Sequence, residues 1–282
     1  MAPFTRSAAP AAWGRHPMTK PLLHFAHANS YPAGTYRQFF AHLEADFDVR
    51  ALDMHGHDPA YPVTDGWPEL ADELIAQLEA YGQPVILAGH SLGGILSMMV
   101  ARRRPELVRC VVMLDSPVVA GWRALLWRVV KNWKWADRFT PAKASARRRE
   151  FWPDSDAAYA HFHSKPMFAA WAPGVLADYL ASGLAPHPEG RALRFTREVE
   201  TAIYRALPHH LGSVLDGRFP VPIGFIGARD SVELRQAGLA ATRALVGENF
   251  MQLEGGHLFP MESPALAAQL TREMIARLLA QA

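Results

Sequence analysis

The sequence predicts an α/β fold built on one mostly parallel sheet, with a helical insertion. Half of the 282 residues are apolar and a fifth are charged, which is the composition of a globular protein with a sizeable core. Short apolar runs alternate with amphipathic stretches over residues 21–117 and 213–282, as in successive βα units. Residues 118–212 interrupt this alternation, because they hold six of the eight tryptophans and no strand-like run. We therefore expect a core in two parts and a helical cap between them.

The first part of the core predicts four strands that alternate with three helices. On the helix over 36–45, Phe39, Phe40 and Leu43 are spaced to share one face. The strand over 108–114 lacks polar alternation, as expected where both faces of a sheet are covered. The predicted elements are a strand over 22–28, a helix over 36–45, a strand over 49–52, a helix over 67–81, a strand over 85–88, a helix over 92–103 and a strand over 108–114.

The second part of the core resumes the same pattern after the insertion. It predicts a strand over 221–227, a helix near 234–246, a strand near 249–253 and a helix over 264–279. No internal repeat is visible, so the two parts are expected to form one continuous core.

Composition and the terminal segment exclude several classes of protein. A net charge of +2, from 29 basic and 27 acidic residues, gives no reason to expect a nucleic acid partner. The single cysteine, Cys110, allows neither an internal disulfide nor a thiolate zinc site, so a reducing, cytoplasmic location is expected. Residues 1–20 predict a disordered leader, with Met18 as an alternative start. The sequence has no uninterrupted stretch of about 18 apolar residues, so no transmembrane segment is predicted.

The segment Gly89-His90-Ser91-Leu92-Gly93 lies between a predicted buried strand and a helix, and Gly94 follows it. A nucleophilic serine needs a sharp strand-to-helix turn, the nucleophile elbow, in which small residues on either side let the chain pass closely. A glycine-rich turn with a capping serine is one alternative. A phosphate-binding loop is another, but its glycine and lysine spacing is absent. The context favours Ser91 as a nucleophile.

A serine nucleophile requires a base, and the base requires a carboxylate that orients it. Among thirteen histidines, His257 is the best placed to act as the base, because it follows the last predicted strand. The alternative interpretation is that His257 is an ordinary histidine of a surface loop. Asp230 ends the strand over 221–227 and gives the chain order Ser, Asp, His. Asp115, at the end of the strand over 108–114, is the alternative acid, or else a turn residue. Chain order favours Asp230.

With these residues in place, the sequence resembles the α/β-hydrolase superfamily from about Lys20 to the end. A further match follows the second strand, where Asp53-Met54-His55-Gly56-His57 is similar to the family's D-x-x-G-H segment. Asp58 and Pro59 stand where the family usually has glycine and serine, which is expected to alter only the local loop. The segments that carry the resemblance are therefore 53–57, 89–94, 227–230 and 255–257.

The resemblance also implies an oxyanion hole made of two backbone N–H groups. The residue after the nucleophile, Leu92, matches the first of these. The second falls in the loop after the first parallel strand, where either Ala28 or Asn29 supplies the N–H. The family's sheet often opens with a hairpin that has no counterpart before Pro21, so a shortened sheet is expected.

The pair His55 and His57, with Asp58 beside them, also raises the possibility of a zinc site. A metallo-hydrolase motif of the H-x-H-x-D-H type requires an aspartate one residue later and a further histidine, and this chain has Pro59 and Ala60 there. Both the number and the spacing of ligands fail, so neither a metal nor an organic cofactor is expected.

The insertion begins with apolar residues at helical spacing. Within the insertion, residues 121–150 hold nine basic residues and two acidic ones. We expect the apolar face to cover the active site and the charges to be solvated; the alternative is contact with an anionic surface such as lipid headgroups. The helical set is Trp122, Leu125, Leu126, Val129, Val130 and Trp133, with Arg123, Lys131 and Lys134 between them.

Further aromatic residues of the insertion indicate either an apolar pocket for an acyl or alcohol group, or a packed cap core: these are Phe151, Phe162 and Phe168, with Met167. A serine nucleophile implies, through the resemblance, hydrolysis of a carboxylic ester, thioester or lactone with an apolar moiety through an acyl-enzyme. Three alternatives stay open: a carbon–carbon bond hydrolase, a cofactor-free lyase or perhydrolase, and a non-catalytic binding module on the same fold.

Overall fold

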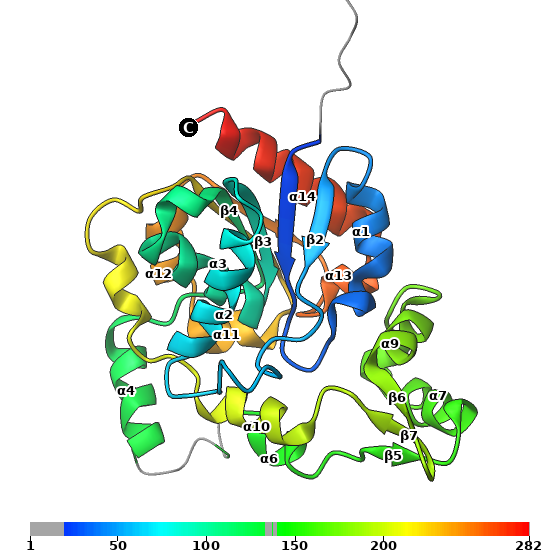
Figure 1. The fold of residues 1–282 in the computed structure, drawn as a ribbon. Coiled ribbons are helices and arrows are strands. Elements are labelled where there is room, and N and C mark those ends of the chain that lie inside the picture. The colour runs from blue at the N-terminus through cyan, green and yellow to red at the C-terminus, as the bar shows by residue number, and fades with distance from the viewer. Residues whose placement is uncertain (1–19, 133–136, 138–139, 282) are drawn as a thin grey trace, which may run out of the picture.

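A six-stranded parallel sheet forms the centre of the computed structural model, which describes residues 20–132, 137 and 140–281 (Figure 1). Its strand order is β2-β1-β3-β4-β8-β9, and every neighbouring pair runs parallel. The predicted α/β class with a mostly parallel sheet is therefore confirmed. The predicted leader with Met18, and Trp133 and Lys134 of the insertion, lie outside the described residues.

The strands of this sheet lie close to the predicted positions. The central strands β3 and β4 are buried over almost their whole length, because helices cover both faces. Along β3 the side chains alternate: Ile86 and Ala88 belong to one core cluster, and Val85 and Leu87 to the other. The strands are β1 (Leu22–Ala26), β2 (Asp48–Ala51), β3 (Val85–His90), β4 (Val108–Leu114), β8 (Ile223–Ala228) and β9 (Phe250–Leu253).

Helices cover the two faces of the sheet in separate groups. Residues of α1 and α14 pack into one core cluster, and residues of α2, α3 and α12 pack into the other. The helix predicted near 234–246 is two helices, because the chain turns at Gly238 with a φ of +74°. The helices are α1 (Arg37–Leu43), α2 (Pro68–Glu79), α3 (Leu92–Arg103), α11 (Val232–Ala237), α12 (Ala240–Val246), α13 (Phe259–Glu262) and α14 (Pro264–Leu279).

The segment between β4 and β8 contains a small antiparallel sheet as well as helices, which corrects the expectation that it has no strands. This sheet has the order β5-β7-β6, with β5 at Phe151–Trp152, β6 at Leu184–His187 and β7 at Gly190–Leu193. Strands of two to four residues leave too little sequence for an alternation to be recognised. The helices are α4 (Gly121–Asn132), α6 (Ala142–Ser145), α7 (Ser155–His163), α8 (Pro166–Ala169), α9 (Val175–Gly183) and α10 (Arg197–Arg205).

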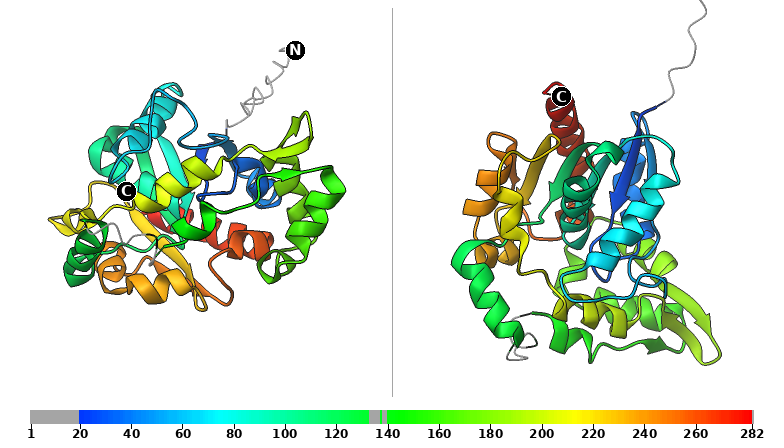
Figure 2. Two further views of the ribbon diagram at one scale, coloured as in Figure 1. Left: turned by 90° about the horizontal axis from the view of Figure 1, so that it is seen from below. Right: turned by 60° about the vertical axis from the view of Figure 1, so that its left-hand side comes forward.

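The inserted segment lies beyond the carboxyl ends of the core strands (Figures 1 and 2). The loops that follow these strands carry the predicted site residues, and such loops are the usual location of ligand sites in parallel sheets. Asn29 follows β1, Ser91 follows β3, Asp115 follows β4 and Asp230 follows β8. Of the helices that the structure describes, none has both the length and the apolar character needed to cross a membrane.

Candidate active site

Ser91 occupies a strained turn between β3 and α3. Its φ is 53° and its ψ is −113°, a conformation that a residue with a side chain adopts only when the surroundings enforce it. The turn is enforced by close packing, because a Cβ added at Gly89 or Gly93 would lie less than 3.0 Å from backbone atoms. The N–H of Ser91 donates to the carbonyl of Leu114 at 2.9 Å, which ties the turn to β4.

His257, from the loop after β9, lies between Ser91 and an aspartate. Its Nε2 is 3.0 Å from Ser91 Oγ, and its Nδ1 is 2.6 Å from Asp115 Oδ2. In the neutral imidazole, Nδ1–H donates to the carboxylate and Nε2 is left free to accept the serine proton. The structure thus brings Ser91, His257 and the alternative acid Asp115 into one hydrogen-bonded line.

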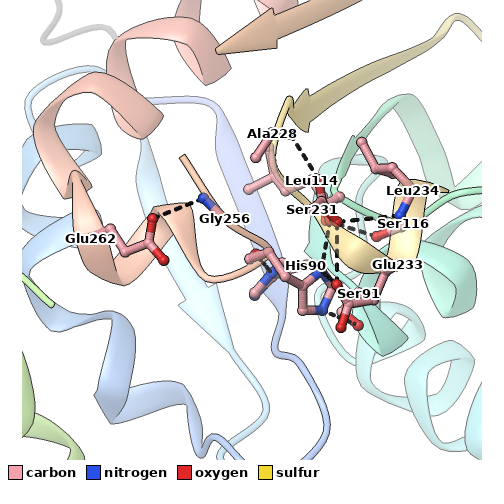
Figure 3. A network of polar contacts seen from close by, with 12 residues as sticks. His90, Ser91, Leu114, Ser116, Ala228, Ser231, Glu233, Leu234, Gly256 and Glu262 are labelled. Atoms are coloured by element: carbon pink, nitrogen blue, oxygen red, sulfur yellow. Dashed lines mark hydrogen bonds and ion pairs between the residues drawn. The ribbon is translucent and has the colours of Figure 1, made fainter. Parts of the chain in front are cut away.

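Asp115 is held rigidly at the end of β4. Its side chain is fully buried, and its φ of 45° is in the left-handed region that aspartate tolerates better than most residues. One carboxylate oxygen accepts the Ala228 N–H at 2.8 Å. The other accepts the Ser231 hydroxyl at 2.5 Å as well as His257. These three hydrogen-bond donors offset the free-energy cost of burying the Asp115 carboxylate. Figure 3 labels Ala228, Ser231 and Glu233 in this network of polar contacts.

The expectation that Asp230 orients His257 is corrected by this geometry. Asp230 is exposed, and its backbone N–H donates to the carbonyl of Gly255 at 3.0 Å. Asp115 follows β4 and Asp230 follows β8. Because β4 and β8 are neighbouring parallel strands, the two aspartates lie at adjacent positions along the same edge of the sheet. The left-handed turn at Asp115 directs this aspartate, rather than Asp230, toward His257. The sequence pattern does not reveal this turn.

A second carboxylate lies near the base. Glu233 Oε2 is 3.7 Å from His257 Nδ1, and the Ser231 hydroxyl lies 3.3 Å from the same glutamate oxygen. Burial lowers the pKa of His257, but the hydrogen bond that His257 donates to Asp115 and the negative charges of Glu233 and Asp115 outweigh it, so the pKa is raised overall. The environment therefore favours the protonated imidazolium form of His257.

A chain of hydrogen bonds that the sequence did not predict connects the loop after β1 to the loop of His257. His90 Nε2 donates to the carbonyl of His257 at 2.8 Å, so its Nδ1 is the acceptor for the Tyr36 hydroxyl at 2.7 Å. The Tyr36 oxygen accepts the Ala28 N–H at 3.1 Å. Burial and the neighbouring His257 lower the pKa of His90 well below its ordinary value, which keeps the ring neutral. A histidine inside a glycine-rich turn was the one available signal.

The same chain of bonds bears on the oxyanion hole. Because the N–H of Ala28 already donates to the Tyr36 hydroxyl, the structure favours Asn29 over Ala28 as the second N–H of the expected oxyanion hole. The Asn29 side chain donates to the carbonyl of Glu200 in α10 at 3.1 Å, which anchors the loop to the inserted segment. Leu92 begins α3, where the first N–H groups of a helix have no partner within the helix.

Of the two histidines considered for zinc, His55 bonds Glu73 through Nδ1 at 3.1 Å, and His57 is bonded through both ring nitrogens. His57 Nδ1 donates to the carbonyl of His55 at 3.1 Å, and its Nε2 accepts the Thr196 N–H at 3.1 Å. Within the described residues, the group whose ligand atoms lie close enough for a metal, within 4.8 Å of one another, is Asp115, Glu233 and His257. Two of these are the residues aligned with Ser91.

Aromatic side chains of the inserted segment reach the loop after β1. Tyr31 lies 5.8 Å from Trp171 and 5.9 Å from Tyr179, measured between ring centroids. Phe168 packs against both of the latter rings, at 4.6 and 5.7 Å. Beside this cluster, Arg148 forms a 2.7 Å ion pair with Glu200, in which both side chains are largely buried. Of the residues that the sequence analysis named, Phe162 and Phe168 are buried in this packed core, whereas Phe151 and Met167 are each 48% exposed.

A parallel sheet of this strand order, with a serine at a strained strand-to-helix turn and a histidine beside it, defines the class of α/β hydrolases. The sequence comparison agrees, since a model of the alpha/beta hydrolase family matches residues 25–270. The chain belongs to this family, and the resemblance seen in the sequence is confirmed.

Individual relatives match the chain over different lengths. Lipase LipV of Mycobacterium tuberculosis is 26% identical over 242 residues, which are 83% of this chain and 86% of the lipase. The 2-(acetamidomethylene)succinate hydrolase of Mesorhizobium japonicum is 30% identical over 98 residues, 34% of this chain and 35% of that protein. A crystal structure of E-2-(acetamidomethylene)succinate hydrolase has a TM-score of 0.75, at 22% identity and 92% coverage of both chains. At that identity, the structural match supports the fold.

Proposed function

We propose that this protein is a serine hydrolase that cleaves a carboxylic ester, thioester or lactone with an apolar moiety. The observation that carries the proposal is the line from Ser91 Oγ to His257 Nε2 at 3.0 Å and from His257 Nδ1 to Asp115 Oδ2 at 2.6 Å. This arrangement supplies a nucleophile, a base and an orienting acid within hydrogen-bond reach of one another. The lipase relative supports an ester as the substrate class.

The first half of the reaction forms an acyl-enzyme. Ser91 Oγ attacks the carbonyl carbon while His257 Nε2 takes the serine proton, and Asp115 stabilises the resulting imidazolium. The negative charge on the carbonyl oxygen is stabilised by the N–H groups of Leu92 and Asn29. When the tetrahedral intermediate collapses, the alkoxide leaves with the proton that His257 carries.

The second half regenerates the serine. Water enters where the alcohol has left, His257 removes its proton, and the hydroxide attacks the acyl carbon. Collapse of this second intermediate returns the proton to Ser91 and releases the carboxylic acid.

The inserted segment supports an apolar substrate and acts as the cap, residues 118–212, of the proposed enzyme. Its aromatic cluster meets Tyr31, next to the proposed oxyanion loop, and so offers an apolar wall beside the nucleophile. The proposed location is the cytoplasm, with which the buried, unpaired thiol of Cys110 agrees.

The test of the proposal is hydrolysis of p-nitrophenyl esters of increasing acyl length by the wild type and by Ser91→Ala. We expect turnover that depends on Ser91 and falls by at least about 10³-fold in the variant. Full activity in Ser91→Ala, with an unchanged fold by circular dichroism, would refute the mechanism.

A second candidate is hydrolysis of a small carboxylate of the kind named for the structural relative, 2-(acetamidomethylene)succinate. The buried Arg148 favours it, because guanidinium groups bind carboxylates in two-point contacts. Glu200 already pairs with Arg148, so we rank this candidate second. Turnover of 2-(acetamidomethylene)succinate in preference to the p-nitrophenyl esters would reverse the ranking.

A further inference from the structure

Helix α4 presents an apolar face to solvent. Four large side chains on one side of it are exposed: Trp122 by 66%, Leu125 by 56%, Leu126 by 53% and Val129 by 45%. Their spacing of three, four and seven residues places them along one side of a helix that turns 100° per residue. The sequence led us to expect this face over the active site, but the structure leaves it uncovered.

The opposite side of α4 holds the helix against the rest of the protein. Trp127 Nε1 donates to the carbonyl of Leu207 at 3.1 Å, and Lys131 Nζ donates to the same carbonyl at 2.8 Å. Val130 is buried on this side. Because these contacts use the inner side, the outer face of Trp122, Leu125, Leu126 and Val129 is free to bind a partner without unfolding the helix.

The charges of α4 identify the kind of partner. The helix, Gly121–Asn132, contains three basic residues and no acidic one. Arg128 is exposed beside the outer face. Arg123, on the other side, is half-buried near Gly238, and its guanidinium lies over the Trp122 ring, 4.6 Å from the centroid. Lys131, by contrast, is paired with Asp65. An apolar ridge with a tryptophan, bordered by basic side chains, is the composition of a helix that lies in the interface of an anionic membrane.

We propose that the outer face of α4 docks on an anionic lipid surface. The four apolar side chains enter the boundary between headgroups and acyl chains, and Arg123 and Arg128 remain at the level of the phosphates. The helix follows β4, and the residues 116–120 connect it to Asp115. The lipid surface thus contacts a helix that is joined to Asp115 of the candidate site by five residues, 116–120. Docking itself requires no catalysis, so this proposal stands apart from the proposed function.

Flotation with vesicles tests the proposal. The wild type is incubated with vesicles of phosphatidylcholine alone or with a quarter of phosphatidylglycerol, at low and at 0.5 M salt, and the bound fraction is measured. We expect binding to the anionic vesicles that weakens at high salt, since screening reduces the attraction of Arg123 and Arg128. Equal binding to both kinds of vesicle, or none to the anionic kind, would overturn the proposal.

Variants locate the contact on α4. Leu125→Ser with Leu126→Ser is expected to weaken partition into anionic vesicles by about tenfold or more, and Arg128→Gln by about fivefold. Leu266→Ser, at a leucine of α14 that is 42% exposed, is the matched control and should bind as the wild type does. Circular dichroism checks that the variants are folded. If the double variant unfolds, two other measurements test the lipid contact. One is vesicle binding by Arg128→Gln, and the other is quenching of tryptophan fluorescence by brominated lipid, compared between the wild type and Trp122→Phe.

A second copy of the chain is the other occupant that an apolar face attracts. Sedimentation velocity distinguishes it from a lipid surface. A wild-type dimer that becomes monomeric in the double serine variant, with vesicle binding unchanged, would assign the face to self-association and overturn the lipid proposal. A monomeric wild type that floats with anionic vesicles supports it.

Discussion

The carboxylate of Asp115 lies 2.6 Å from Nδ1 of His257, whereas Asp230, which ends the neighbouring strand, is exposed to solvent. We predict that Asp115→Asn lowers kcat by roughly 10⁴-fold, because an amide holds the histidine in the wrong tautomer. Asp230→Asn, the matched variant, should retain kcat within about twofold, since its side chain makes no contact with the proposed triad. Steady-state hydrolysis by the two purified proteins compares them directly; the opposite ranking would return the role to Asp230.

The pH profile of kcat/KM should report His257, because only its neutral form accepts the serine proton. Its pKa is raised above the ordinary 6.5, so activity is lost as the pH falls through a value above 6.5. Glu233→Gln removes a negative charge 3.7 Å from Nδ1, lowers the pKa and moves the acid limb to lower pH, with the plateau unchanged. The Glu233 side chain is 47% exposed, so solvent screens the effect and the movement is small.

NMR titration of the His257 ring checks the same shift without any substrate. A pKa of His257 that is identical in the wild type and in Glu233→Gln would show that Glu233 does not act on the base.

Tyr36 should matter for both stability and turnover. Tyr36→Phe leaves the Ala28 N–H and His90 Nδ1 without their shared partner, and we expect a loss of about 1–3 kcal/mol in the free energy of unfolding. Because the two loops it connects carry the proposed oxyanion donor and His257, kcat should fall as well, with KM little changed. Thermal unfolding and steady-state kinetics measure the two effects.

Tyr81→Phe is the control for this prediction. The Tyr81 hydroxyl also bonds a buried histidine, His24 Nδ1, at 3.0 Å, but that pair has no contact with the site. Its loss should lower stability without lowering kcat. Equal kinetic effects in the two variants would mean that Tyr36 acts only through general stability.

The turn at Ser91 should tolerate no side chain at Gly93. A Cβ there would collide with the backbone and side chain of Ala26, so Gly93→Ala is expected to cost on the order of 1–3 kcal/mol in unfolding free energy and to displace Ser91. At Gly212 an added Cβ meets Ala120 at an ordinary 3.5 Å, and Gly212→Ala should change stability by less than about 1 kcal/mol. Chemical denaturation of the two variants measures the difference.

The sequence predicted the core well because its signals are local. The buried apolar run of β4 and the helical spacing of α3 and α14 fix those elements at the bounds that the structure has. The strands β5, β6 and β7 were missed because they are short, and because the pairing of β5 with β7 joins residues far apart in the chain, such as Phe151 and Ala192.

The contact between Ser91 and His257 was predictable, because Ser91 lies in a motif that determines the local shape and His257 follows the last strand. Which aspartate bonds His257 was not predictable, because Asp115 and Asp230 end adjacent strands and only the backbone turn at Asp115 distinguishes them. The bond from Tyr36 to His90 joins a helix start to a strand end 54 residues away, and no sequence period encodes such a contact.

The most direct test of the central claim is the site of labelling by a fluorophosphonate, located by mass spectrometry of the digested protein. Our account predicts one adduct, on the peptide that contains Ser91. It also predicts no adduct in Ser91→Ala, and labelling slowed by orders of magnitude in His257→Ala and Asp115→Asn, whereas Asp230→Asn labels at the wild-type rate. An unlabelled Ser91 in the folded wild type, or a label on another serine that survives Ser91→Ala, would contradict it.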